Sequence, residues 1–241
     1  MAFIHGKTTQ ILHGVFDLSS FMNSGQVSRS AETSETTSFG STAKTYIVGL
    51  VDGSLSASGM FDGSASAVDD ILSSSIGSDT LSPVTFAIDG TTLGNRVSLL
   101  QAKATKYDVS SPVGDVVSVS YDAQADGGVD QGVSLAALTS VSASTTTTSH
   151  DNAASSTNGG MAQLHVTANT RSSTSVIKVQ HSSDNSTWAD LATFATVAIT
   201  TTTSERLAVA AATTVNRYLR TVCTLAAGSN SITYQVSFAR R

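Results

Sequence analysis

The chain has 241 residues, of which 40% are hydrophobic and only 13% charged, and its formal net charge at pH 7 is −5. Ser, Thr, Ala and Gly take the places that charged residues usually hold. This favours β-structure over helix bundles, because Thr fits a pleated strand and Ser and Gly fit turns. Residues 1–140 carry six Lys and Arg against fourteen Asp and Glu, while residues 141–241 carry seven against four. An acidic first half would repel the phosphates of nucleic acids, which argues against nucleic-acid binding by this part of the chain.

The beginning of the chain and its cysteine usage suggest a cytosolic origin. Residues 1–7 lack the basic and apolar regions of a signal peptide, and no apolar run in the sequence approaches the length of a membrane span. We therefore expect no membrane partner. Cys223 is the only cysteine, so no intrachain disulfide is expected, and its apolar surroundings favour a buried, inert thiol.

The first part of the chain shows the alternation of strands. Apolar and small residues alternate with Ser over 54–61 and again over 117–121, a period typical of strands with one buried face. Asp52-Gly53 is typical of a turn and predicts a hairpin between 46–51 and the strand that starts at Ser54. Apolar residues at helical spacing predict one short helix over 66–76, which Ser64 or Ser66 caps and Gly77 ends.

A Ser/Thr/Gly-rich stretch divides the sequence. Residues 142–160 contain almost no large apolar side chains and are typical of a linker or long loop. We therefore predict a first domain over 1–141, a linker over 142–160 and a second domain over 161–241. In the second domain, strands are predicted near 162–168, 174–181, 187–194, 204–210, 215–223 and 232–238. Short strands with regular turns indicate an immunoglobulin-like sandwich, so the predicted fold class is all-β.

The sequence holds no convincing catalytic, metal or cofactor site. The five histidines lack zinc-site spacing, and a turn beside a strand end explains His181 and Asp184 better than a base and its orienter. Residues 6–8 fail as a phosphate loop, because the required earlier glycine is missing. An acidic helix start explains Asp69-Asp70, and an exposed turn explains Asp122–Asp130 better than a calcium loop. Trp188 is interpreted as a core residue rather than a sugar platform. We expect no enzyme and no cofactor.

Residues 11–62 resemble the opening of major tail proteins, also called tail tube proteins, of long-tailed, non-contractile bacteriophages. The similarity lies in an Asp-Leu-Ser segment before an aromatic residue, a polar loop with Thr-Thr-x-Phe-Gly, a Gly-Leu-x-Asp-Gly pattern and a Ser-Gly-x-Phe strand end. In this chain these are residues 17–21, 36–40, 49–53 and 58–61. Residues 179–191, 217–220 and 236–240 resemble sandwich domains appended to phage virion proteins.

The resemblance implies an assembly rather than a reaction. Proteins of this family form hexameric rings that stack into a tube through which DNA is ejected. The implied partners are further copies of the chain, the tape measure and terminator proteins of the tail, and double-stranded DNA that passes without specific binding. Assembly would take place in the cytoplasm of the host bacterium, and the finished protein would belong to the virion tail, where the second domain would form a decoration outside the tube.

Two groups of residues are candidates for this role. The polar loop over 32–43 is the candidate ring-stacking element, with Glu32, Glu35, Thr36, Thr37, Phe39 and the neighbouring Lys44 as its members. Acids that flank predicted strands are candidates for the channel wall, where they would repel DNA, and these are Asp108, Asp115 and Asp122. The alternatives are a capsid decoration or other virion structural protein, and a carbohydrate-binding adhesin that acts through the second domain.

Overall fold

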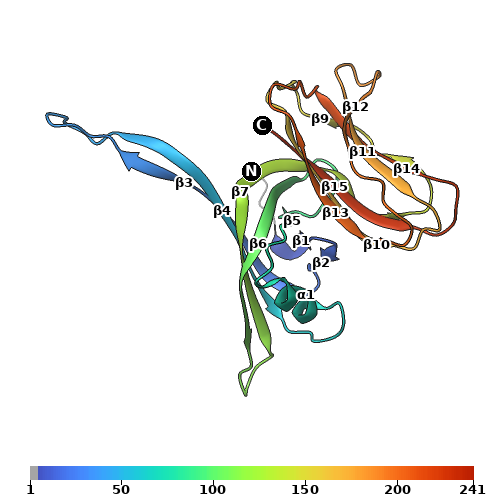
Figure 1. The fold of residues 1–241 in the computed structure, drawn as a ribbon, viewed down its shortest axis with the longest axis horizontal. Helices are drawn as coiled ribbons and strands as arrows, with labels where there is room; N and C mark the ends of the chain where they lie inside the picture. The colour runs from blue at the N-terminus through green and yellow to red at the C-terminus, as the bar shows by residue number, and fades with distance from the viewer. Residues whose placement is uncertain (1–4) are drawn as a thin grey trace. The chain divides into compact units, whose positions relative to one another are not determined.

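The computed structural model describes residues 5–241, and these confirm the all-β class (Figure 1). Within that range there is one α-helix, α1 (Val68–Ser75), and one 3-10 turn, η1 (Gly6–Thr8). The chain forms two compact units. Unit 1 contains the described residues up to Ser20 together with Ser82–Leu99 and Asp130–Arg241. Unit 2 contains Phe21–Leu81 and Leu100–Val129.

Unit 1 is built around a sandwich of two sheets. One sheet has the order β13-β10-β15-β7, and the other has the order β12-β11-β14, with the short β8 and β9 along β14. The six predicted strands of this region are present as β10 (Gly160–Asn169), β11 (Ser175–Ser182), β12 (Ala189–Thr193), β13 (Thr203–Val209), β14 (Tyr218–Leu225) and β15 (Ile232–Arg240). The sandwich also contains β7 (Ser118–Val141), β8 (Thr145–Thr146) and β9 (His150–Asp151), which the sequence pattern does not predict as part of it. Their alternating inward residues share one core, to which Leu164 and Val236 contribute from one sheet and Ile177 and Leu219 from the other.

The stretch expected as a linker is paired with the sandwich. Thr145 and Thr146 of β8 pair with Cys223 and Val222 of β14, and Ser156 forms a bridge with Val215. The backbone N–H of Thr147 also donates to the carbonyl of Thr221 at 2.9 Å. Backbone pairing needs no large side chains, so a Ser/Thr-rich segment can be held along a strand edge while its composition still resembles a linker.

The compact units also differ from the expected division at residue 141. The N-terminal strands β1 (Gln10–His13), β2 (Phe16–Asp17) and β5 (Ser82–Ala87) belong to the same unit as the sandwich. Thr85 of β5 hydrogen-bonds with His165 of β10 at 2.8 Å. Ala87 of β5 shares a buried apolar cluster with Met161 and Ala239. These contacts join residues that lie more than seventy positions apart, which local patterns cannot reveal.

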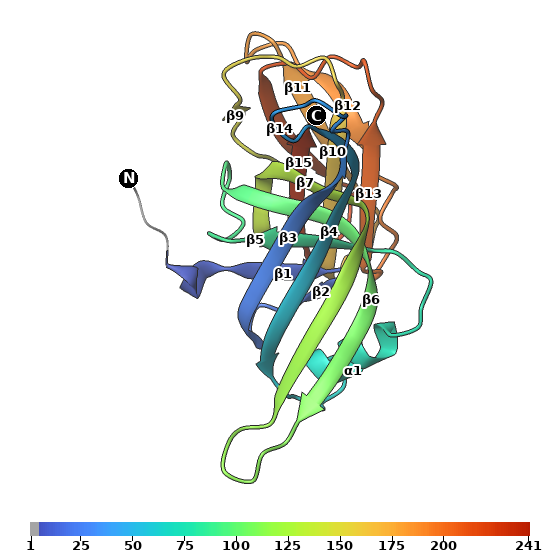
Figure 2. The same cartoon turned by 90° about the vertical axis from the view of Figure 1, so that its left-hand side faces the viewer.

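Unit 2 is a sheet of long strands. β3 (Met22–Glu35) pairs with β4 (Tyr46–Met60), and β4 pairs with the first part of β7. The second half of β6 (Arg96–Ser110) follows next to β7. Figure 2 shows these four strands side by side. Leu55, Ala57, Val119 and Tyr121 are buried on one face of this sheet.

The predicted hairpin turn at Asp52-Gly53 is wrong, because both residues lie inside β4. Asp52 pairs with Ser30 and Gly53 pairs with Arg29. A Cβ atom at Gly53 would lie 2.5 Å from Cγ2 of Val129 and 3.2 Å from the carbonyl oxygen of Ser28. The glycine therefore serves a close approach within the sheet and not a turn.

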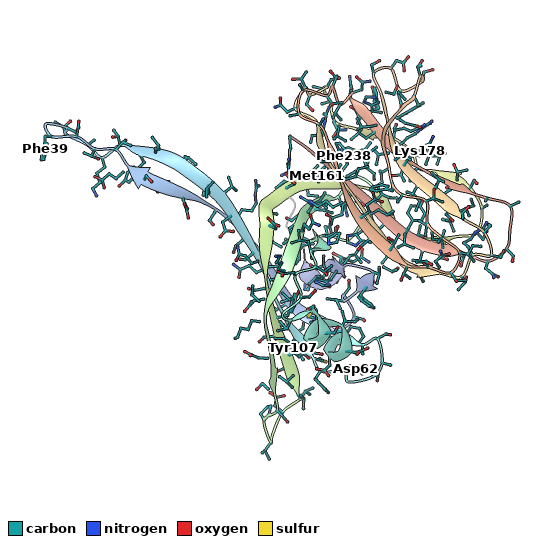
Figure 3. All side chains as sticks on the ribbon, in the orientation of Figure 1. Phe39, Asp62, Tyr107, Met161, Lys178 and Phe238 are labelled. Atoms are coloured by element: carbon teal, nitrogen blue, oxygen red, sulfur yellow. The ribbon has the colours of Figure 1, made fainter. Side chains whose placement is uncertain are left out.

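The predicted helix is confirmed as α1, and its apolar residues Val68, Ile71 and Leu72 are buried. Its N-cap is Ala67, which makes no side-chain cap, so the expected serine cap is wrong. Instead the Asp70 carboxylate accepts from the backbone N–H of Ser66 at 2.9 Å. The Tyr107 hydroxyl of β6 donates to Asp69 at 2.6 Å, and Figure 3 shows Tyr107 beside the helix. Gly77 follows the helix with φ +77°, as a C-terminal glycine should.

Candidate functional site

The most unusual surface of unit 2 is a two-stranded ribbon, here called the arm (Ser28–Asp52). Every residue of the arm is exposed. It contains the second half of β3, a tip over 36–45 and the first half of β4, and Figure 1 shows the two strands running together to the tip. β4 pairs with β7 only from Ser54 onward, so within residues 5–241 no third strand is paired with the arm, although Gly128 of β7 lies near Val51 at its base.

The β4 side of the arm is apolar on both faces. It reads Tyr46-Ile47-Val48-Gly49-Leu50-Val51, and the exposed fractions of its five large side chains range from 55% to 77%. Val48 pairs with Thr33 and Val51 with Ala31, with a register shift between them. Continuous apolar runs are typical of strands buried on both faces. The arm therefore has the sequence of a buried strand, but it is uncovered in the single chain.

The candidate stacking residues all lie on the arm, and the loop is shorter than expected. Glu32 and Glu35 belong to β3, so only the tip over 36–45 lacks strand structure. Thr36 closes the tip, because its N–H donates to the carbonyl of Thr45 at 2.8 Å. Thr37 accepts from the N–H of Thr45 at 3.1 Å. Phe39 lies at the tip with its side chain fully exposed (Figure 3).

An ion pair fixes the two strands at the base of the tip. The Lys44 ammonium lies 2.9 Å from the Glu35 carboxylate. The hydrogen bond from Lys44 lowers the pKa of Glu35. Both side chains are largely exposed, so the pair orders the tip more than it stabilises the fold.

A second group of exposed apolar residues lies at the opposite end of the same sheet and is here called the distal cluster. The N–H of Phe61 donates to the carbonyl of Val117 at 3.0 Å, which joins the end of β4 to the β6–β7 hairpin. The register puts Met60 of β4 opposite Ser118 of β7, while the arm lies beyond the other end of that pairing. The members of the distal cluster are Met60, Phe61, Val109, Val113 and Val116.

These two groups account for nearly all of the exposed apolar surface made by large side chains. Among residues 5–241, every exposed large hydrophobic residue except Ile88 and Ile199 belongs to unit 2. Single exposed apolar residues are ordinary on protein surfaces, whereas grouped ones mark interaction sites. Unit 2 therefore has a group of exposed apolar residues at each end of its sheet.

The sheet of unit 2 also has a broad polar face. Directly paired residues point to the same face of an antiparallel sheet, and here they form successive polar rows across three strands. The rows are Ser24–Ser58–Ser120, Gln26–Ser56–Asp122 and Ser28–Ser54–Gln124. Asp52 pairs with Ser30 and extends this face toward the arm. No Lys or Arg occupies these rows, although Lys106 of the neighbouring β6 interacts electrostatically with Asp122.

The three candidate channel acids are not equivalent. Asp122 is half-buried and belongs to the polar face. Asp108 lies near the end of β6 and pairs with Lys106 at 2.6 Å, which compensates its charge. Asp115 is exposed in the β6–β7 turn and accepts from the N–H of Val116. Asp52, which the sequence prediction missed because it was interpreted as a turn residue, belongs with Asp122.

The other sequence candidates have structural roles. Nδ1 of His181 accepts from the N–H of Asn216 at 3.2 Å, while the Asp184 carboxylate accepts from the N–H groups of Ser186 and Thr187. Asp122–Asp130 belongs to β7, so the expected exposed turn is wrong. No group of three or more metal-binding side chains occurs in the described range.

Two further residues test the interpretations of the second half of the chain. Cys223 is buried, as predicted, and burial raises the pKa of its thiol to about 11. Trp188 is only half-buried, so its assignment to the core is wrong. The Arg220 guanidinium lies over the indole ring at 4.0 Å from the centroid. The short strand β12 starts at the next residue, which leaves Trp188 at the sheet margin.

No helix among the described residues is long and apolar enough to cross a membrane. No protein-family model and no curated protein matches the sequence.

Several solved structures resemble the fold weakly, including the following three. A gene transfer agent virion chain is 17% identical, with coverage of 54% of this chain and 98% of its own, at a TM-score of 0.43. A chain from the tail of an empty gene transfer agent particle is 16% identical. The match covers 53% of this chain and 97% of that chain, at a TM-score of 0.42. The SPP1 Dit protein, a hub of a phage adsorption apparatus, is 12% identical. The match covers 96% of this chain and 98% of that chain, at a TM-score of 0.38. Scores below 0.5 support no argument about function.

Proposed function

We propose that this chain is a structural subunit of a phage tail tube and polymerises through the sheet of unit 2. The observation that carries the proposal is the arm, whose apolar residues are exposed on both faces of a two-stranded ribbon. Burial of one large apolar side chain contributes about 1.5–3 kcal/mol. Burial of Tyr46, Ile47, Val48, Leu50 and Val51 against neighbouring copies would therefore drive assembly.

The separation of the two apolar surfaces favours an open polymer. The arm and the distal cluster lie at opposite ends of one sheet. A contact between two different surfaces of identical subunits is head-to-tail, and such contacts form filaments unless the rotation closes them. Stacking of the arm of one copy against the distal end of the next would produce a tube of repeating rings.

The two edge strands of the sheet in unit 2 support the pairing of neighbouring copies within one ring. Among the described residues, β3 pairs with β4 alone, so its other edge has no paired strand there over its fourteen residues. Within unit 2, β6 is the last strand on the opposite side. Open edges are templates for pairing with another chain, and pairing of two different edges closes a ring at some fixed number of copies. A hexamer is what the family resemblance implies.

The polar face of the sheet suits the channel wall of such a tube. Rows of Ser and Gln with Asp52 and Asp122 present hydroxyls and carboxylates. DNA phosphates gain affinity from Lys and Arg through counterion release, and the rows contain neither. DNA would therefore pass along this face without being held.

Negative-stain electron microscopy of the purified chain and two variants tests the proposal. We expect rings or tubes from the unmodified chain and none from Leu50→Ser, which removes an apolar group that is 77% exposed on the arm. Ile199→Ser is the matched control, because Ile199 is 51% exposed outside unit 2, and it should assemble normally. Equal assembly of both variants would contradict the role of the arm.

A further inference from the structure

The outer face of the β12-β11-β14 sheet in unit 1 carries a connected set of polar side chains next to Trp188. Nε and Nη2 of Arg220 both donate to Oε1 of Gln180, at 2.9 and 2.8 Å. Nε2 of Gln180 donates to Asp190 at 2.7 Å. Nζ of Lys178 donates to the other oxygen of Asp190 at 2.9 Å. We call these five residues, Trp188, Arg220, Gln180, Asp190 and Lys178, the platform.

Trp188 is held in place by a cation–π contact and by the turn that precedes it. The Arg220 guanidinium stacks over the Trp188 indole at 4.0 Å from its centroid. The turn before Trp188 is closed by Asp184, whose carboxylate accepts from the N–H groups of Ser186 and Thr187 at 2.9 and 2.8 Å and from the Ser182 hydroxyl. Side chains that are fixed before binding lose little entropy when a ligand arrives.

The platform also keeps free hydrogen-bonding capacity, and its balance is cationic. Among the described residues, Nη1 of Arg220 has no partner, and Lys178 uses one of its three N–H groups. Asp190 is the only acid of the set, against Arg220 and Lys178. Neighbouring Arg217 is different, because Asp151 neutralises it through two bonds of 2.7 Å.

We propose that the platform binds an acidic saccharide, with the sugar ring against the exposed part of Trp188 and its carboxylate on Arg220 and Lys178. An indole with adjacent amide, carboxylate and ammonium groups offers an apolar surface and both donors and acceptors for ring hydroxyls. The free guanidinium nitrogen adds a charge-assisted hydrogen bond to the carboxylate. This inference is independent of the tube proposal, since it uses only residues of unit 1.

Intrinsic fluorescence provides a clean measurement, because Trp188 is the only tryptophan. The full chain is titrated with glucuronate and, separately, with glucose. We expect a saturable change with glucuronate at a Kd on the order of 1 mM, as for one shallow site, and at least a tenfold weaker response to glucose. Arg220→Gln and Lys178→Gln should each raise the Kd for glucuronate several-fold.

Two controls separate binding from structural support. Arg217→Gln removes an equal charge from an arginine that is stacked on Tyr218 but neutralised, and should leave the Kd unchanged. Thermal melting reports whether each variant folds. If Arg220→Gln does not fold, the glucuronate titration of Lys178→Gln tests the proposal. The proposal would be overturned if glucuronate caused no fluorescence change, or if glucose bound as tightly as glucuronate. It would also be overturned if Arg217→Gln weakened glucuronate binding as much as Arg220→Gln does, or if inorganic phosphate or an oligonucleotide bound as tightly as glucuronate.

Discussion

A chain of buried polar residues connects the N-terminal strands of unit 1 to the sandwich. Nη1 of Arg206 donates to Gln163 at 2.8 Å, and Gln163 donates to Thr85 at 2.8 Å. Nδ1 of His165 lies 2.7 Å from the carbonyl oxygen of Gly14, so it carries the proton and donates. Nε2 must then accept from Thr85. His165 is therefore held neutral and satisfied on both nitrogens.

We predict that acid destabilises unit 1 through its buried histidines. Burial lowers the pKa of His165 and of His13 from 6.5 to about 4. Because the folded pKa lies below the unfolded one, stability is complete above pH 6.5 and falls as the pH drops toward 4. The loss is at most about 3 kcal/mol for each histidine. Chemical denaturation at several pH values measures it.

His165→Gln is the matched variant for this measurement. Glutamine can donate to Gly14 and accept from Thr85, but it does not titrate. Its stability should depend less on pH between 6.5 and 4 than that of the unmodified chain. An unchanged pH dependence would show that other groups cause the acid sensitivity.

We also predict that Asp130→Ala is strongly destabilising. The Asp130 carboxylate accepts from Arg206 at 2.6 Å and from Arg241 at 3.0 Å, and the Arg206 side chain is only 6% exposed. Removing one partner leaves a buried charge uncompensated, which costs about 3 kcal/mol or more. Denaturant unfolding measures the loss. Asp151→Ala breaks the exposed Arg217 pair and should leave the midpoint nearly unchanged, and equal effects would contradict the prediction.

At the scale of elements, the arm divides into a paired ribbon and a tip. β3 and β4 stay paired up to Glu35 and Tyr46, so the strands do not depend on the tip for their pairing. Within the part of the chain that the structure describes, the tip forms hydrogen bonds only among its own residues and at its base. Assembly and folding can therefore be separated by changes in this element.

We predict that replacing residues 37–44 with Asn-Gly leaves a folded chain that does not form tubes. Asn-Gly closes a two-residue hairpin, so the ribbon should persist, while Phe39 and the Lys44–Glu35 pair are lost. Circular dichroism checks the fold and electron microscopy checks assembly. A variant that carries only Lys44→Gln should still assemble, because an exposed ion pair contributes little. Long tubes from the shortened variant would refute a stacking role for the tip.

At the scale of the whole molecule, the proposed tube repeats the polar face of unit 2 around a channel. At physiological salt, charges act over about 8 Å. Only carboxylates on the face itself would then influence passing DNA. Of the three acids that the sequence suggested for the channel wall, Asp122 lies on this polar face. Asp52 lies on the same face.

We predict that Asp122→Lys slows genome ejection without preventing tube assembly. A lysine on the channel wall would gain affinity for phosphate by counterion release. Asp122→Asn should have a smaller effect, and Ser155→Lys, on an exposed loop of unit 1, should have none. Phage particles that carry each variant can be compared by the rate of DNA release. Ejection that is indifferent to Asp122→Lys would exclude this face as the channel wall.

The sequence by itself determined the elements whose signal is local. Alternation over 232–238 and helical spacing over 66–76 correspond to β15 and α1, because burial of one face imposes its period on neighbouring residues. The candidate stacking residues are contiguous in the sequence and therefore all lie on the arm, in β3 and the tip, and their role in stacking stays a prediction.

Only the tertiary structure decided which segments belong together. Asp52-Gly53 has the composition of a turn but lies in a strand, because its backbone pairs with Arg29 and Ser30 of β3. Residues 142–160 resemble a linker but pair along β14. The strands before residue 20 join the sandwich through His165 and Gly14. In each case a backbone or buried polar group is satisfied by a partner distant in sequence, and no local pattern encodes such a partner.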